Sequence, residues 1–190
     1  MRDIKDIEKR IIEVPLKKED IDGLHSGDYV YLSGTIYTAR DAAHKRLYES
    51  MKRNEPLPLD LNGNVIYYLG PSPAREGQII GSAGPTTSSR MDKYTPAMLD
   101  AGLKGMVGKG KRSYEVIRSM IKNKAVYFAA VGGAGALLSK CIKEAEVIAY
   151  EDLGTEAIRR LLIKELPVIV VVDKEGNNLY ETAAEEWKRS

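Results

Sequence analysis

Segments typical of β-strands alternate with segments of helical period through the second half of this 190-residue chain. A buried strand is predicted at 125–131, followed by a helix at 134–145, a strand at 146–153, a helix at 155–166 and a strand at 167–173. Alternation of strand, helix and strand favours a parallel sheet that is covered by helices.

The first half of the chain contains more strands than helices. Strands are expected at 9–16, 28–37, 64–70 and 78–84, with helices only at 41–53 and, near the middle of the chain, 115–123. We therefore expect an additional, partly antiparallel layer beside the parallel one. The predicted fold class is α/β, in a single domain that spans residues 1–190, since a chain of this length suits one compact core.

Charge and composition exclude several classes of protein. The formal net charge is +2, which predicts no nucleic-acid-binding surface. The longest apolar run, Leu166–Val172, is too short to cross a membrane, and the charged N-terminus contains no apolar core of a signal peptide. We therefore expect a cytoplasmic protein without a membrane partner.

Metal-binding residues are scarce in this chain. The single cysteine, Cys141, can form neither an internal disulfide framework nor an iron–sulfur site, which normally needs three or four thiolates. The two histidines, His25 and His44, lack the spacing of metal ligands. No metal site is predicted in this chain.

The sequence GPTTSSRMD at 84–92 is the densest group of candidate ligand-binding residues. Four adjacent hydroxyl groups and the guanidinium of Arg90 suit an anion, because hydroxyls donate to carboxylate oxygens and arginine forms a bidentate pair with them. A helix beginning near Ser88 or Ser89 would add its dipole. The alternative is an ordinary loop that ends in a helix cap, since serine and threonine are favoured there.

Two further segments offer cations at the ends of expected strands. Lys109 lies in a glycine-flanked turn, where the backbone can approach a ligand closely. Arg40 lies at a strand-to-helix junction, where α/β sheets tend to bind ligands, and Asp41 could cap the helix. The alternatives are a solvated lysine in a turn and a surface arginine that pairs with Asp41.

A glycine-rich run, Gly132-Gly133-Ala134-Gly135, follows an expected strand and suggests a nucleotide-binding loop. The dinucleotide pattern needs a further glycine at position 138, which is Leu138. Close packing between a helix and a strand explains these glycines without a nucleotide.

Three segments in this order, TARDAAHKR, GPTTSSRMD and MVGKGKRS, together resemble one family more specifically than any of them does alone. They are similar to the β-type domain of class I, iron–sulfur fumarases and to the β subunit of L(+)-tartrate dehydratase. DLNGNVIYYLGP, YEDLGTEAI and VDKEGNNLY are also similar to this family, so the resemblance runs from about Ile11 to Tyr180. The resemblance implies a three-layer swivelling β/β/α domain with one parallel and one antiparallel sheet.

The resemblance also implies a division of labour and a set of site residues. An α-type subunit would hold a [4Fe–4S] cluster, and this chain would be a separate β subunit of a hetero-oligomer, with a β–β dimer as a further option. By matching motifs, Thr86 is expected as catalytic base, and Arg40, Thr87, Arg90 and Lys109 as residues at a dicarboxylate substrate.

The expected activity is that of a hydro-lyase, the reversible hydration of fumarate to L-malate. The nearest alternative is the β subunit of L(+)-tartrate dehydratase. A non-catalytic anion-binding or assembly domain and a nucleotide-binding protein are the alternatives from other classes.

Overall fold

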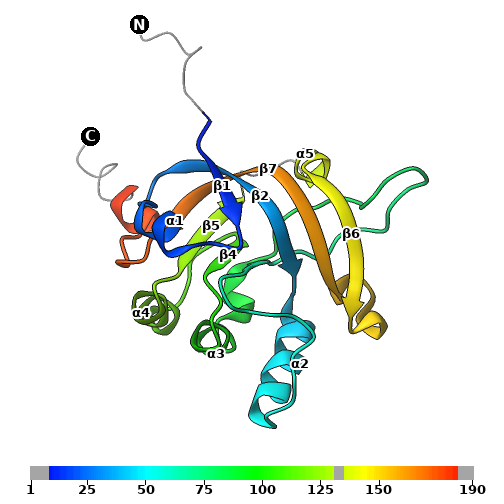
Figure 1. Ribbon diagram of the computed structural model, residues 1–190, viewed down its shortest axis with the longest axis horizontal. Helices are drawn as coiled ribbons and strands as arrows, with labels where there is room; N and C mark the ends of the chain where they lie inside the picture. Colours follow the sequence, from blue (N-terminus) through cyan, green and yellow to red (C-terminus); the bar gives the residue numbers. More distant parts are fainter. Residues whose placement is uncertain (1–8, 131–134, 184–190) are drawn as a thin grey trace, which may run out of the picture.

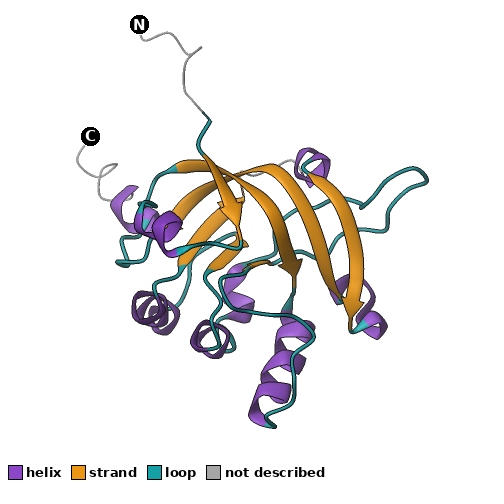
Figure 2. Ribbon diagram, viewed as in Figure 1, coloured by secondary structure: helices purple, strands orange, loops and turns teal. Residues whose placement is uncertain are grey.

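The computed structural model describes residues 9–130 and 135–183 of the chain. Its strands are β1 (Ile11–Val14), β2 (Tyr29–Thr38), β3 (Val65–Tyr67), β4 (Gly105–Gly108), β5 (Val126–Ala130), β6 (Ile142–Ala149) and β7 (Ile158–Val172). Its helices are α1 (Lys18–Asp22), α2 (Asp41–Lys52), α3 (Thr95–Asp100), α4 (Tyr114–Asn123) and α5 (Gly135–Lys140), with short 3₁₀ helices η2 (Ser88–Met91) and η3 (Glu151–Glu156). The fold is mixed α/β, as predicted (Figures 1 and 2).

The seven strands form one sheet that closes on itself. Their order is β1-β2-β3-β4-β5-β7-β6, and β2 also pairs with β7. The pairs β1–β2, β2–β3, β3–β4 and β4–β5 are parallel, whereas β7 pairs in antiparallel fashion with β2, β5 and β6. Parallel and antiparallel pairings therefore meet in β2 and in β5. Each of these strands pairs in parallel with its other neighbours and in antiparallel fashion with β7.

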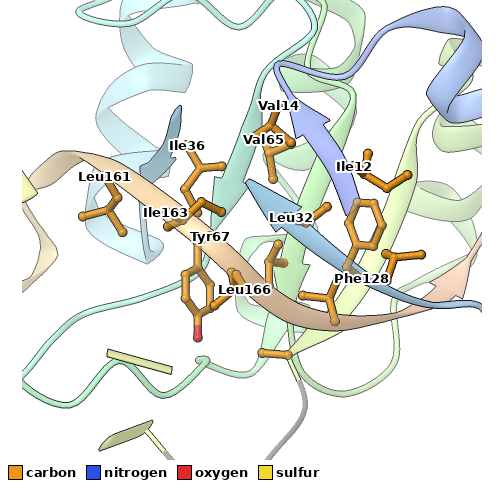
Figure 3. Close-up of a cluster of buried hydrophobic side chains, with 14 of the residues drawn as sticks. Ile12, Val14, Leu32, Ile36, Val65, Tyr67, Phe128, Leu161, Ile163 and Leu166 are labelled. Carbon is orange, nitrogen blue, oxygen red and sulfur yellow. The ribbon is translucent and has the colours of Figure 1, made fainter. Parts of the chain in front are cut away.

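Two hydrophobic clusters lie on opposite faces of the parallel strands. Successive side chains of a strand point to opposite faces, so Val65 and Tyr67 of β3 join one cluster, while Ile66 and Tyr68 join the other. The first cluster fills the space between the parallel strands and β7 (Figure 3). The second packs under α2, α3 and α4, which lie on one side of the sheet (Figure 1).

Burial on both faces explains the apolar character of the parallel strands. Tyr67, Tyr127 and Phe128 are among the largest fully buried side chains. Burying a side chain the size of Phe128 stabilises the fold by about 2–3 kcal/mol. The helix α4 begins where the Ser113 hydroxyl accepts a hydrogen bond from the Val116 N–H, and it buries Val116 and Met120 one turn apart.

The helix predicted at 155–166 is wrong, because these residues form most of β7. Ile158, Leu161 and Leu162 stand at positions i, i+3 and i+4, which imitates a helical face. In β7, Leu161 is buried and Leu162 is exposed, as strand alternation requires. A bulge at Glu165, with φ of 52°, then shifts the alternation by one residue.

Other expected elements differ in their extent. The helix predicted at 134–145 is limited to α5, and β6 begins at Ile142, so the last third of the chain forms an antiparallel pair instead of a parallel unit. Residues 78–84 form no strand and pass through a loop with one bridge, Leu69 to Pro85, at its end. The predicted strand at 146–153 overlaps β6 only up to Ala149, since η3 follows, and the predicted strand at 167–173 is the end of the longer β7. The predicted strands at 9–16, 28–37, 64–70 and 125–131 and the helices at 41–53 and 115–123 are confirmed within a few residues.

Candidate functional site

The carboxyl ends of β2, β3 and β4 form one rim of the sheet. Thr38 pairs with Tyr67, and Tyr67 pairs with Val107, so these three residues stand in a row. Arg40 and Lys109 each lie two residues beyond this row, after β2 and β4. Because α/β sheets bind ligands at the carboxyl ends of their parallel strands, the rim is the expected place for a site.

The loop that carries Thr86 and Thr87 is joined to this rim by backbone hydrogen bonds. The Thr86 N–H donates to the Tyr68 carbonyl at 2.7 Å, and the Ser88 N–H donates to the Lys109 carbonyl at 2.9 Å. Thr87 and Lys109 are partners in a parallel bridge. The structure thus brings Thr86, Thr87 and Lys109 together, and we call this part of the rim the threonine side.

The hydroxyl of Ser88 supports the threonine side from below. It accepts a hydrogen bond from the Lys109 N–H at 3.1 Å and bonds to the Tyr127 hydroxyl at 2.9 Å. Tyr127 in turn donates to the Gly110 carbonyl at 2.8 Å, and burial raises the pKa of this phenol, so it stays protonated. Of the four adjacent hydroxyls, Ser88 is therefore engaged within the protein and not available to a ligand.

A buried ion pair holds the same loop from its other end. The Arg112 side chain is fully buried, and its Nε donates to Asp92 Oδ1 at 2.8 Å. Its two other nitrogens bond to the Tyr68 hydroxyl at 3.1 Å and the Thr95 hydroxyl at 2.8 Å. Burial opposes the charge of Arg112, but the coulombic influence of Tyr68 and Asp92 outweighs it and raises its pKa.

The two predicted arginines meet at Asp41, and we call this part of the rim the arginine side. Arg90 Nη2 lies 2.6 Å from Asp41 Oδ2, and Arg40 Nε lies 3.8 Å from Asp41 Oδ1. Arg40 also pairs with Glu156 at 3.3 Å. Arg40 lies so close to Gly70 that a Cβ there would come within 2.7 Å of its guanidinium. The structure therefore brings Arg40 and Arg90 together through a shared carboxylate.

His44 lies fully buried beneath the arginine side. Its Nδ1 is 2.9 Å from the Arg40 carbonyl and donates to it, while its ring packs between Tyr68 and Tyr94. Burial lowers the pKa of His44 to about 4, so the ring is neutral near pH 7. His44 therefore has a structural role, in which its ring packs the core and its Nδ1 binds the start of α2.

Two local expectations for this rim need correction. Asp41 does not cap α2, because the cap position is Arg40 and Asp41 is the first helical residue, facing the two arginines. The helix expected near Ser88 is present only as the four-residue η2. Sequence reasoning also missed Arg112 and Asp92, whose pairing links positions twenty residues apart and leaves no local pattern.

Cys141 does not fit an iron–sulfur centre in this chain. Its side chain packs against the first hydrophobic cluster, and burial raises the pKa of its thiol, which disfavours the thiolate that binds iron. Within residues 9–130 and 135–183 there is no group of three His, Cys, Asp or Glu residues placed to hold a metal ion. Gly132 and Gly133 of the suggested nucleotide loop lie outside the described residues.

The candidate residues stand on an open surface of this chain. Thr87, Arg90 and Lys109 are exposed, and Thr86 is half-buried. A nearby cleft of about 510 Å³ lies between the 71–81 loop and β6, reaches Thr155 and Arg159, and contains none of the five predicted residues. No helix in the described part of the chain has the length and apolar character needed to cross a membrane.

Comparisons with known proteins agree on one family. A family model described as the fumarase C-terminus matches residues 2–183. The chain is 39% identical over 172 residues to a Methanocaldococcus jannaschii protein provisionally named L(+)-tartrate dehydratase subunit beta, covering 87% of this chain and 88% of that protein. It is 37% identical over 176 residues to the L(+)-tartrate dehydratase subunit beta of Escherichia coli, covering 90% and 86%.

The chain is also similar to longer proteins. It is 39% identical over 152 residues to the aerobic class I fumarate hydratase of Salmonella typhimurium, covering 79% of this chain and 26% of that protein. The chain therefore spans about a quarter of the length of that fumarate hydratase and most of the length of the two tartrate dehydratase subunits.

Proposed function

Because this chain belongs to the fumarase C-terminus family, we propose that it is the β subunit of an iron–sulfur-dependent fumarate hydratase. Its part of the reaction, the reversible hydration of fumarate to L-malate, is to bind the dicarboxylate and to move the proton at carbon. The observation that carries this proposal is the convergence of two arginines, a lysine and two threonines on one rim of the sheet.

Charge explains the binding role of the rim. Fumarate and malate are dianions, and Arg40, Arg90 and Lys109 would neutralise their carboxylates. Arginine suits this task because its planar fork can bind both oxygens of a carboxylate. Holding the substrate by both ends also fixes the reacting carbons relative to the base.

Thr86 is the proposed base. In the dehydration direction its oxygen, as the alkoxide, takes the proton from the carbon beside a carboxylate, and negative charge develops on that carboxylate. The cluster of the α-type subunit would act as the Lewis acid for the hydroxyl group that leaves the other carbon. Cations that face the carboxylate stabilise this charge more in the transition state than in the ground state. Support for the role comes from the neighbouring Thr87, whose backbone is bridged to Lys109, so that a lysine stands close to the proposed base.

A partner subunit completes the proposed enzyme. One partly buried thiol with a raised pKa does not suit a [4Fe–4S] cluster, so the cluster belongs to an α-type subunit, as do the remaining site residues. The exposure of Thr87, Arg90 and Lys109 supports a site completed by a second polypeptide. A hetero-oligomer in the cytoplasm is part of this proposal.

The proposed fold is a single domain with three layers. The helices, the parallel strands and the antiparallel β6–β7 pair are separated by the two hydrophobic clusters. This order of layers supports the swivelling β/β/α domain expected from the resemblance.

The second candidate function is that of an L(+)-tartrate dehydratase β subunit, since two relatives with that name are covered over most of their length. Both substrates carry two carboxylates, so the same rim suits either. We expect the chain, coexpressed with an α-type subunit and assayed without oxygen, to turn over fumarate and malate at a higher kcat/KM than tartrate. A higher value for tartrate would replace the proposal by the second candidate, and turnover of neither would reject both.

A further inference from the structure

The two arginines of the arginine side are held by carboxylates in different ways. Arg90 pairs with Asp41 at 2.6 Å, and 52% of the Arg90 side chain is exposed. Arg40 is only 19% exposed and pairs with Glu156, whose other oxygen accepts the Ala42 N–H at 2.9 Å. Glu156 is therefore fixed to the start of α2, and it fixes Arg40 in turn, whereas the pair between Arg90 and Asp41 lies towards solvent.

One carboxylate oxygen of Asp41 lacks a hydrogen-bond partner within the described part of the chain. Its Oδ1 and the Nε of Arg40 are buried, and neither has a hydrogen-bond partner among the described residues. The two atoms are 3.8 Å apart, which is too far for a hydrogen bond between them. Asp41 is thus directed at both arginines, but only its contact with Arg90 is close.

The charges of this cluster cancel without a ligand. Arg40 and Arg90 carry two positive charges, and Asp41 and Glu156 carry two negative ones. A dicarboxylate that pairs with Arg90 must therefore take the place of a carboxylate that is already present. Exchange of one carboxylate for another keeps the ion pair, and an exposed pair is weak enough to exchange readily.

We infer that Asp41 determines the affinity of the site by occupying Arg90 in the free protein and yielding it to one carboxylate of the dicarboxylate. Glu156 keeps its hold on Arg40 throughout, as a positioning residue. This inference rests on the proposed function and adds an internal competitor for the substrate to it. Asp41 acts through its contacts with the two binding arginines.

The test is a calorimetric titration of succinate, a dicarboxylate that cannot be hydrated, into the complex of this chain with its α-type subunit. Asp41→Asn keeps the shape and removes the charge, so succinate should bind about two- to fivefold more tightly, the range set by the strength of exposed ion pairs. In an Arg90→Ala background the same substitution should give no tightening, because no guanidinium remains for Asp41 to occupy. Asp41→Ser is a second variant with the same expectation if Asp41→Asn unfolds.

Asp152→Asn is the matched control. It also removes one carboxylate near α2, but Asp152 pairs with Arg46 and with neither site arginine. Succinate affinity should stay within about 1.5-fold, since exposed charges away from the site are screened. Weaker or unchanged binding in Asp41→Asn, equal tightening in Asp152→Asn, or tightening that persists without Arg90 would each overturn the inference.

Turnover separates this inference from the proposed function. If the complex binds succinate as described but hydrates no fumarate, the function fails and the competitor role of Asp41 stands. If the complex hydrates fumarate but Asp41→Asn does not tighten succinate binding, the inference fails and the function stands. A wild-type complex that binds no succinate at all would overturn the inference as well.

Discussion

The two sides of the rim are built in opposite ways. On the threonine side, the loop is held by buried groups: the Ser88 hydroxyl, the Tyr127 phenol and the Arg112–Asp92 ion pair. On the arginine side, Arg90 is held by Asp41 at a half-exposed ion pair. The proposed base thus stands on a rigid support, whereas a binding arginine can exchange its partner. This difference suits a site in which proton transfer needs fixed geometry and substrate entry needs movement.

The largest effect is expected from the proposed base. Thr86→Ala in the reconstituted complex should lower kcat by about 10²- to 10⁴-fold, the usual contribution of an acid–base group. Thr87→Ala, one residue along the same loop, is the matched control and should lower kcat far less. Steady-state kinetics on fumarate measure both, and equal loss in the two variants would remove the distinction between base and neighbour.

Breaking the buried ion pair tests the rigidity of the threonine side. Arg112→Met leaves Asp92 without its buried partner, so the free energy of unfolding should fall by about 3–5 kcal/mol. Arg118→Met, on the exposed face of α4, should change it by less than about 0.5 kcal/mol. Urea unfolding measures both, and a loss below about 1 kcal/mol for Arg112→Met would contradict the rigid support.

The histidine beneath the arginine side gives a pH prediction. The folded pKa of His44 is about 4, below its ordinary 6.5, so the folded state favours the neutral ring. Its stabilising contribution is complete above pH 6.5 and is lost as pH falls from 6.5 to 4, by about 3 kcal/mol in total. His44→Phe should remove this part of the pH dependence of urea unfolding, and an unchanged slope between pH 4 and 6.5 would contradict the buried neutral ring.

The smallest effect is expected at the hydroxyl beneath the loop. Ser88→Ala leaves the Lys109 N–H and the Tyr127 hydroxyl short of a partner, so the free energy of unfolding should fall by about 1–2 kcal/mol. Ser89→Ala, exposed on the same 3₁₀ helix, is the control and should change it by less than about 0.5 kcal/mol. If the two variants are equally stable, the Ser88 network does not support the loop.

Sequence patterns predicted the parts of this molecule that depend on neighbouring residues. The helix at 41–53 and the apolar strands around Ile66 and Tyr127 follow from local periodicity, and their structures agree. The pattern failed at β7, where Ile158, Leu161 and Leu162 fit a helix equally well, and pairing with β2 and β6 makes a strand. Contacts with strands far away in the sequence determine that these residues form a strand and not a helix, and local periodicity gives no information on such contacts.

In the candidate site, too, contacts between distant residues could not be predicted from the sequence. The roles of Thr86 and Arg90 were predicted from a motif, and they stay predictions; the structure adds that they share a rim with Arg40 and Lys109. Asp41 was recognised only as a helix cap or a partner of Arg40, because its contact with Arg90 joins residues far apart in the sequence. Polar contacts between residues far apart in the chain are thus the part of the site that sequence patterns did not predict.

One measurement tests most directly whether the site at this rim is shared between two polypeptides. Fumarate hydration should be assayed without oxygen for this chain alone, for the α-type subunit alone and for the two combined, with iron determined in each sample. We expect turnover only in the combined sample, with iron in the α-type subunit. Hydration by this chain alone, free of iron, would contradict the account.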